Sequence, residues 1–184
     1  MRGELAHDVG RWLADLEATR RASAHTLDAY RHDLLLLTEV LAKDGIVSTA
    51  QVDATAIRHT VSALHRRGLG GRSLQRLLSA CRGFFGYCIE RGELAANPAL
   101  GIAAPRAPRR LPTALDVDQA ARLLDPQPQG WEQVRDHAIM ELFYSSGLRL
   151  AELCGLDGTD LDLPGALVTV TGKGGRTRTV PVGR

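Results

Sequence analysis

The chain has 184 residues, of which 44% are hydrophobic and only 4% aromatic, enough apolar material for one medium domain or two small ones packed through helices. The net charge of +2 at pH 7 does not by itself indicate a nucleic-acid partner, so that argument depends on where the basic residues lie. No apolar run approaches the length of a membrane span, and the N-terminus lacks an apolar signal core. We therefore expect a cytoplasmic protein with no membrane partner.

Four helices are predicted in the first half of the chain, at about residues 5–17, 26–43, 54–67 and 72–91. Apolar residues recur at helical spacing on one face of the second of these helices. They are Leu27, Tyr30, Leu34, Leu37 and Leu41. Glycines follow the third and fourth helices, where they favour termination. These features predict a four-helix bundle.

The fourth predicted helix has a basic side. Arg72, Arg76 and Arg82 lie opposite its apolar arc, and the helix contains only one acidic residue, near its far end. Two interpretations remain open for this side. It is either a solvated surface or a face that contacts the phosphates and the major groove of a nucleic acid.

Residues 98–112 are predicted to be a linker, because four prolines in this stretch favour an extended backbone. Arg106, Arg109 and Arg110 lie in it without acidic neighbours. The segment is therefore either a merely soluble connection or a basic strap across a polyanion.

A second domain is predicted from about residue 113 onward. Asp116 and Gln119 resemble a capping box that opens a helix, and a further helix is predicted at about residues 131–145. A short helix at 148–154 precedes a β-hairpin, whose strands are predicted at 167–171 and 177–181. The fold class is thus mainly α, with one small antiparallel hairpin.

Three residues of this second domain suit phosphate chemistry. Arg149 and Glu152 are three residues apart in the predicted short helix, and Lys173 lies in the glycine-rich turn of the hairpin. An arginine can hold two nonbridging oxygens of a phosphate, and a lysine can donate a proton to a leaving oxygen. The alternatives are a plain helical ion pair and an ordinary turn lysine. The histidines show no spacing typical of metal ligands, so we expect no metal.

The sequence resembles the tyrosine recombinases, and within them the Xer-type chromosome-dimer resolvases and related integrases. The resemblance depends on the order and spacing of several short segments. They are Ser-Ala-His-Thr-Leu-Asp-Ala-Tyr-Arg-His-Asp-Leu at 23–34, Leu-Ala-Ala-Asn-Pro at 94–98, Gly-Leu-Arg at 147–149 with Glu152 and Leu153, and Gly-Lys-Gly at 172–174 with Arg176.

This resemblance implies a SAM-like, four-helix core-binding domain at residues 1–97 and the first part of an α+β catalytic domain at 113–184. The two would form a clamp around double-stranded DNA, with the second and fourth helices facing the major groove and its phosphates. The residues expected to contact DNA are Ser23, His25, Thr26, Arg31, Arg72, Ser73, Arg76, Arg82, Arg106, Arg109, Arg110 and Arg176.

The resemblance also implies a chemistry. A tyrosine attacks the phosphorus, forms a 3′-phosphotyrosyl bond and releases a 5′-hydroxyl, with no ATP, cofactor or metal ion. By position, Arg149 would bind the nonbridging oxygens, Glu152 would support Arg149, and Lys173 would be the general acid. The parent protein is expected to act as a tetramer on two copies of a short inverted-repeat site. Whether a second, related recombinase joins it is left open.

The sequence also departs from the family. Beyond the hairpin the family has a His-x-x-Arg segment, a further His or Trp and the nucleophilic tyrosine, and none of these occurs here. Tyr30, Tyr87 and Tyr144 all precede Lys173, so none matches the nucleophile. We expect this chain alone to bind DNA without cutting it.

Four hypotheses follow. The chain is the N-terminal portion of a chromosome-dimer resolvase, the integrase of a mobile element, a naturally truncated regulator that binds DNA, or a helical interaction protein with no role on DNA. Chromosome-dimer resolution is favoured because no additional arm-binding domain precedes the first helix.

Overall fold

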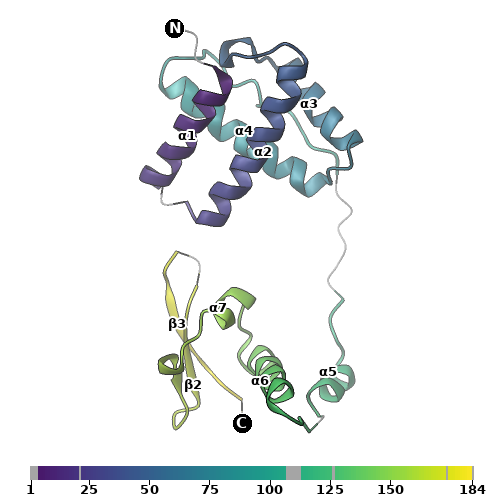
Figure 1. Ribbon diagram of the computed structural model, residues 1–184, viewed down its shortest axis with the longest axis vertical. Coiled ribbons are helices and arrows are strands. Elements are labelled where there is room, and N and C mark those ends of the chain that lie inside the picture. Colours follow the sequence, from purple (N-terminus) through teal and green to yellow (C-terminus); the bar gives the residue numbers. More distant parts are fainter. Residues whose placement is uncertain (1–3, 21, 107–112, 126, 173, 184) are drawn as a thin grey trace. The chain divides into compact units, whose positions relative to one another are not determined.

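The computed structural model describes residues 4–20, 22–106, 113–125, 127–172 and 174–183 (Figure 1). The chain divides into two compact units, Met1–Arg110 and Leu111–Arg184. Each unit has its own apolar core. Of the helices in the described ranges, none is long and apolar enough to cross a membrane.

The first unit contains the four predicted helices, which are α1 (Leu5–Arg20), α2 (Ala24–Lys43), α3 (Ala54–Arg66) and α4 (Gly71–Glu90). A short 3-10 helix, η1 (Thr49–Gln51), lies between α2 and α3. Helix α2 begins two residues earlier than the leucine pattern predicted, because the Ser23 side chain accepts a hydrogen bond from the Thr26 backbone N–H and caps it. Asp53 caps α3 in the same way.

The core of the first unit lies where the helix periodicity placed it. Leu34, Leu37 and Leu41 of α2 are fully buried, and so are Phe84 and Phe85 of α4. One apolar cluster joins these side chains to residues of α1 and α3. The spacing of apolar residues in the sequence was therefore sufficient to predict which faces of α2 and α4 are buried.

The chain that follows α4 packs back onto the first unit. Ala99 and Ile102 are buried in its core, and the Arg82 guanidinium donates to the carbonyl oxygens of both, at 3.3 and 2.7 Å. The Asn97 side chain in turn donates to the Arg82 carbonyl oxygen, at 2.9 Å. The predicted linker began at residue 98, whereas the structure keeps the chain in contact with the first unit as far as Ala104, which packs against the same core.

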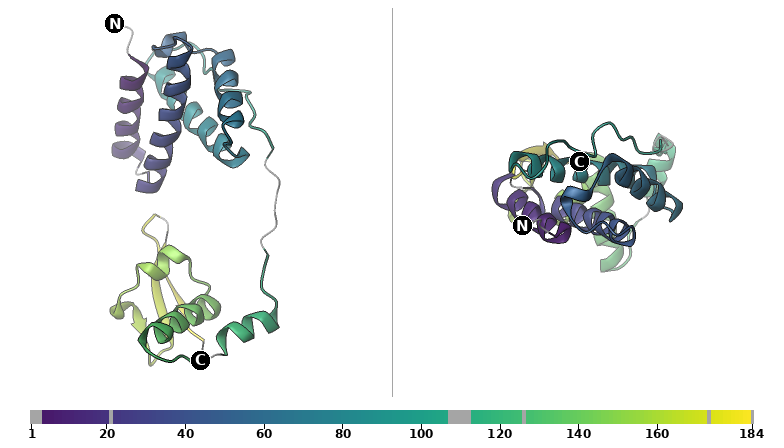
Figure 2. Two further views of the ribbon diagram at one scale, coloured as in Figure 1. Left: turned by 45° about the vertical axis from the view of Figure 1, so that its right-hand side comes forward. Right: turned by 90° about the horizontal axis from the view of Figure 1, so that it is seen from above.

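In its described residues, the second unit has three helices, α5 (Val117–Leu124), α6 (Trp131–Ser146) and α7 (Leu150–Cys154), and a short 3-10 helix, η2 (Gly158–Asp160). Its antiparallel sheet has the order β1 (Leu161–Asp162), β2 (Leu167–Thr171) and β3 (Thr177–Pro181). The predicted hairpin of β2 and β3 is present, and the two-residue strand β1 was not predicted. Figure 2 shows the same elements from two further directions.

The strand register determines which side chains of the hairpin face the helices. Val168 pairs with Val180 and Val170 with Arg178, so these four residues share one face of the sheet. Val168 and Val170 are buried there together with Leu148, the residue just before Arg149. Arg178 is thus the charged member of an otherwise apolar inner face.

The three cysteines, Cys81, Cys88 and Cys154, are odd in number and include no CxxC pair, so the sequence predicts reduced core thiols. Cys81 and Cys88 are buried in the first unit, where burial raises the pKa of the Cys81 thiol to about 12. Cys154 is exposed, so the expectation was wrong for this residue. It is the last residue of the short helix α7, whose apolar contacts to the core come instead from Leu153.

Candidate phosphate-binding site

Arg149 lies at the junction of α6 and α7. Gly147 ends α6 in the left-handed conformation, at φ 58° and ψ 35°, which favours glycine. Arg149 is extended, at φ −81° and ψ 151°, and is the residue that caps α7. The sequence had placed it inside the helix, which was wrong by two residues. The reason is that the Glu152 carboxylate accepts the Arg149 backbone N–H at 2.8 Å and so fixes the helix start after it.

Glu152 is held by two arginines. Its Oε1 accepts Nη1 of Arg149 at 2.9 Å, and the Arg178 guanidinium donates to both carboxylate oxygens, with Nη2 to Oε2 at 2.8 Å. The Arg178 bonds, followed by the Arg149 backbone N–H, lower the pKa of Glu152 from 4.5 to about 2. The Glu152 side chain is only 3% exposed, whereas that of Arg149 is 75% exposed. The site therefore combines a buried, ionised carboxylate of Glu152 with a solvent-exposed guanidinium of Arg149.

The hairpin turn begins next to this carboxylate. A Cβ on Gly172 would come within 3.1 Å of the Glu152 Oε1, so only glycine fits there without displacement. The Gly172 N–H donates to the Arg176 carbonyl oxygen at 2.7 Å and closes the turn, in which Gly174 and Gly175 have positive φ. Lys173, the predicted general acid, follows Gly172 in sequence and lies outside the described residues.

Arg178 was not among the residues predicted to form the site. Its sequence position, in a strand after the hairpin turn, predicts a DNA backbone contact or a solvated strand charge. The alternation of β3 contains a usable clue, because Arg178 and Val180 are two residues apart and so point to the same side of the strand. An arginine on the inner face of a hairpin needs an acidic partner, and Glu152 is that partner.

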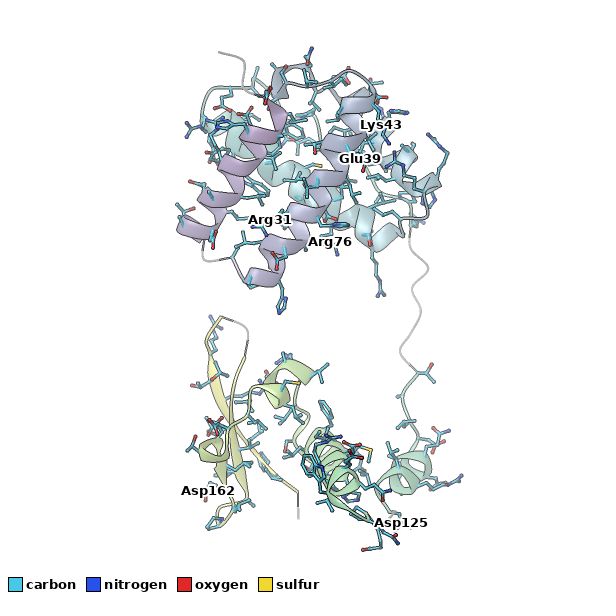
Figure 3. The ribbon with its side chains drawn as sticks, in the orientation of Figure 1. Arg31, Glu39, Lys43, Arg76, Asp125 and Asp162 are labelled. Atoms are coloured by element: carbon cyan, nitrogen blue, oxygen red, sulfur yellow. The ribbon has the colours of Figure 1, made fainter. Side chains whose placement is uncertain are left out.

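Several predicted DNA contacts lie near the start of α2. Ser23 caps the helix, and its hydroxyl is 2.9 Å from that of Thr26. His25 and Arg31 are exposed, and Arg31 is paired with Asp28 at 2.6 Å (Figure 3). This end of α2 therefore offers hydroxyls, an imidazole and a guanidinium to the solvent.

The basic residues of α4 have different surroundings. Arg72 is exposed and Ser73 half-buried, as expected for residues near the helix start. Arg76 forms a bidentate pair with Asp33 of α2, with Nε to Oδ2 at 2.7 Å and Nη2 to Oδ1 at 3.0 Å (Figure 3). Arg82, which was predicted to face outward, is half-buried against the segment at Ala99.

Asp33 is the second residue that sequence analysis missed. Its side chain is fully buried, and 45% of the Arg76 side chain remains exposed.

Of the remaining predicted contacts, Arg106 and Arg176 are exposed, and Arg109 and Arg110 lie outside the described residues. Within the described ranges, no three His, Cys, Asp or Glu side chains are grouped closely enough to hold a metal ion.

Comparison with known proteins gives the same family for both units. The sequence model described as "Phage integrase, N-terminal SAM-like domain" matches residues 9–92, and that of the "Phage integrase family" matches residues 113–184. Tyrosine recombinase XerC of Xanthomonas campestris pv. campestris (strain B100) is 51% identical over 172 residues, which are 94% of this chain and 53% of that protein. Tyrosine recombinase XerC of Pseudomonas aeruginosa (strain LESB58) is 46% identical over 178 residues, 96% of this chain and 59% of that protein.

Solved structures share the fold. A lambda integrase(75-356) dimer bound to a COC′ core site has a TM-score of 0.73 at 21% identity, over 97% of this chain and 62% of that one. The Tn1549 transposon integrase in complex with a circular intermediate DNA has a TM-score of 0.73 at 14% identity, over 99% of this chain and 62% of that one.

These are the helical unit and the hairpin-bearing unit of a phage-integrase-type protein. The chain belongs to the tyrosine recombinase family. It spans about half the length of the curated relative from Xanthomonas campestris that it matches. The resemblance stated from the sequence and the fold class that it implied are confirmed.

Proposed function

We propose that the protein acts in site-specific recombination of double-stranded DNA, and that residues 1–184 supply DNA binding and part of the strand-cutting site. The observation that carries this proposal is the turn at Arg149. There an exposed guanidinium is held by an ionised carboxylate, next to a hairpin turn that contains a lysine. A fixed, exposed guanidinium suits the nonbridging oxygens of a phosphodiester.

The proposed chemistry follows from the charges. Arg149 donates N–H groups to the nonbridging oxygens of the phosphate, whose negative charge grows as the phosphorus becomes five-coordinate. A preorganised donor therefore stabilises the transition state more than the bound substrate, and removing one typically costs about 3–4 kcal/mol. Lys173 protonates the leaving 5′-oxygen. Because none of Tyr30, Tyr87 and Tyr144 matches the nucleophile, the 184-residue chain alone binds DNA without cutting it.

The proposed partners are a short inverted-repeat site in double-stranded DNA and further recombinase subunits, four in all, on two duplexes. Solved structures of lambda integrase, as a dimer on a core site and as a tetramer on a Holliday junction, support this partner class by analogy of fold. The naming of the curated relatives as XerC supports chromosome-dimer resolution over mobile-element integration. A related second recombinase in the tetramer is part of the same proposal, as is action on the chromosome in the cytoplasm.

Binding of a fluorescent duplex, measured by anisotropy at increasing salt, tests this function. Several arginine–phosphate contacts should make affinity fall by a factor on the order of a thousand between about 50 and 200 mM salt. A matched pair of variants locates the contact: R31Q near the start of α2 and K43Q at its end (Figure 3). Each removes one exposed cation paired with an acid on the same helix.

We expect R31Q to weaken binding and to lower the salt slope by about one, and K43Q to change neither. No binding at low salt would favour a helical interaction protein without a role on DNA. A covalent phosphotyrosyl adduct with the 184-residue chain, seen on a denaturing gel, would contradict the proposed lack of cutting.

A further inference from the structure

Two arginines share the Glu152 carboxylate, but they are placed differently. Arg178 offers it a parallel pair of N–H groups, the most directional geometry for an arginine and a carboxylate. Its side chain is 37% exposed, against 75% for Arg149. The Arg178 side chain is thus directed at the carboxylate and partly covered, whereas the Arg149 side chain is open to the solvent.

The hydrogen bonds of Glu152 fill the carboxylate. Two ionised oxygens offer about four acceptor positions. Four bonds reach them: from the Arg149 backbone N–H, from its Nη1, and from Nη1 and Nη2 of Arg178. Only Nη1 of the Arg149 guanidinium is bonded to Glu152, so the other N–H groups of that guanidinium can point toward a ligand.

The charges of the three residues give Arg178 a second role. Arg149 and Glu152 alone would form a neutral pair, whose attraction for an anion is small. With Arg178 the group carries a net charge of +1, because the carboxylate is balanced from the hairpin side. Arg149 can then act as an uncompensated cation toward a phosphate.

The same pair ties two parts of the second unit together. The bonds from Arg178 to Glu152 join residues 26 positions apart, one on β3 and one in the first turn of α7. Arg178 pairs across the hairpin with buried Val170, and the turn that contains Lys173 lies between the paired Thr171 and Thr177. The ion pair therefore fixes the base of this turn against the segment that bears Arg149.

We propose that Arg178 is a positioning residue for Arg149: it holds Glu152 from the hairpin side, leaves the site with a net positive charge, and fixes the hairpin against the Arg149 turn. This inference rests on the proposed function, in which Arg149 binds a DNA phosphate. Arg178 itself does not need to contact DNA.

A double-mutant cycle on the affinity for a fluorescent duplex tests the proposal. R149Q and R178Q should each weaken binding by a similar factor, on the order of tenfold, and the double variant should lose little more. R178K keeps the charge but loses the paired geometry, so it should bind with intermediate affinity. R176Q is the matched control, because Arg176 is exposed at the same hairpin. The factor by which R176Q weakens binding should multiply with that of R149Q when the two are combined. If the factors of R178Q and R149Q also multiply in their double variant, the proposal is overturned.

A second readout does not depend on DNA. In R178Q, the carboxyl carbon of Glu152 should titrate at a higher pKa, and the NMR signal of the Arg149 backbone N–H should move, because its bond to Oε2 loosens. In R176Q neither should change. An unchanged Arg149 signal in R178Q would overturn the positioning role, whether or not the wild-type chain binds DNA. Failure of the wild-type chain to bind DNA would count against the proposed function alone.

Folding of each variant is checked by the methyl signals of buried Val168 and Val170. If R178Q loses these signals, R178K takes its place in both measurements, since a lysine can still balance the carboxylate. Wild-type affinity and an unmoved Arg149 signal in a folded R178K would then overturn the proposal.

Discussion

Glu152 shows how one buried carboxylate organises a site made mostly of cations. It caps α7 through the Arg149 backbone, orients the Arg149 side chain and anchors Arg178 of the hairpin. A carboxylic acid could not accept all four bonds, because protonation converts one acceptor position into a donor. The geometry of the site therefore depends on the charge of this one residue.

This dependence predicts acid sensitivity of the second unit. The pKa of Glu152 is about 2 in the folded chain, below its ordinary 4.5, so the unfolded state takes up a proton first as the pH falls. The stabilisation is fully present above about pH 5 and is lost as the pH falls toward 2. Amide NMR signals of β2 and β3, followed between these pH values, should weaken in the wild type. E152Q should be destabilised at neutral pH and should show no further loss of stability from this residue between about pH 5 and 2. If its amide signals weaken with pH as those of the wild type do, the prediction is contradicted.

At the scale of elements, α2 and α4 are joined by apolar packing and by one ion pair. Asp33 is fully buried among the leucines of α2, and Arg76 of α4 reaches it with two bonds. A buried carboxylate without a partner is costly, so Arg76 stabilises this pair of helices whether or not it also meets a phosphate. The pair explains why an arginine predicted to face DNA is tied to the protein.

Removal of Arg76 should destabilise the first unit by about 3 kcal/mol, the low end for breaking a buried pair, because this arginine is partly exposed. The measurement is urea unfolding of R76M followed by Trp12 fluorescence. The only other tryptophan, Trp131, is replaced by W131F in all samples. The double variant D33L/R76M should recover most of the loss, since it removes the buried charge as well. A loss below about 1 kcal/mol in R76M would mean that the ion pair contributes little.

The elements also show what the sequence could predict. Leucine spacing and the Asp116–Gln119 capping box were sufficient for the helices, since both depend on neighbours within a few residues. Arg76 as the partner of Asp33 and Arg178 as a second partner of Glu152 were not predictable in this way, because they lie 43 and 26 residues away on other elements. The burial of Ile102 was missed for a similar reason: the short apolar stretch around it is bounded by prolines and has no helical or strand periodicity to reveal it.

At the scale of the whole molecule, the two units differ in the size of their cores. The apolar cluster of the first unit extends from Leu5 to Ile102. In the described part of the second, only Leu148, Val168 and Val170 are buried hydrophobics, and large side chains such as Trp131 and Leu123 are exposed. Since stability follows buried apolar area, the first unit should be the more stable of the two.

This difference makes limited proteolysis informative about the segment that joins the units. The sequence left two hypotheses for its arginines, a soluble linker or a basic strap on a polyanion. Trypsin can cut after Arg106, Arg109 and Arg110, all beyond Ile102, the last residue buried in the core of the first unit. We expect the first cuts there, releasing a helical fragment that resists further digestion.

Adding duplex DNA should distinguish the two hypotheses. A strap that binds phosphates will be protected, and cleavage after these three arginines should slow severalfold at low salt and recover at high salt. A soluble linker will be cut at the same rate with and without DNA. Hydrolysis of a small chromogenic peptide by the same trypsin, unchanged by DNA, controls for inhibition of the protease. Protection that persists at high salt would contradict a contact made mainly by charge.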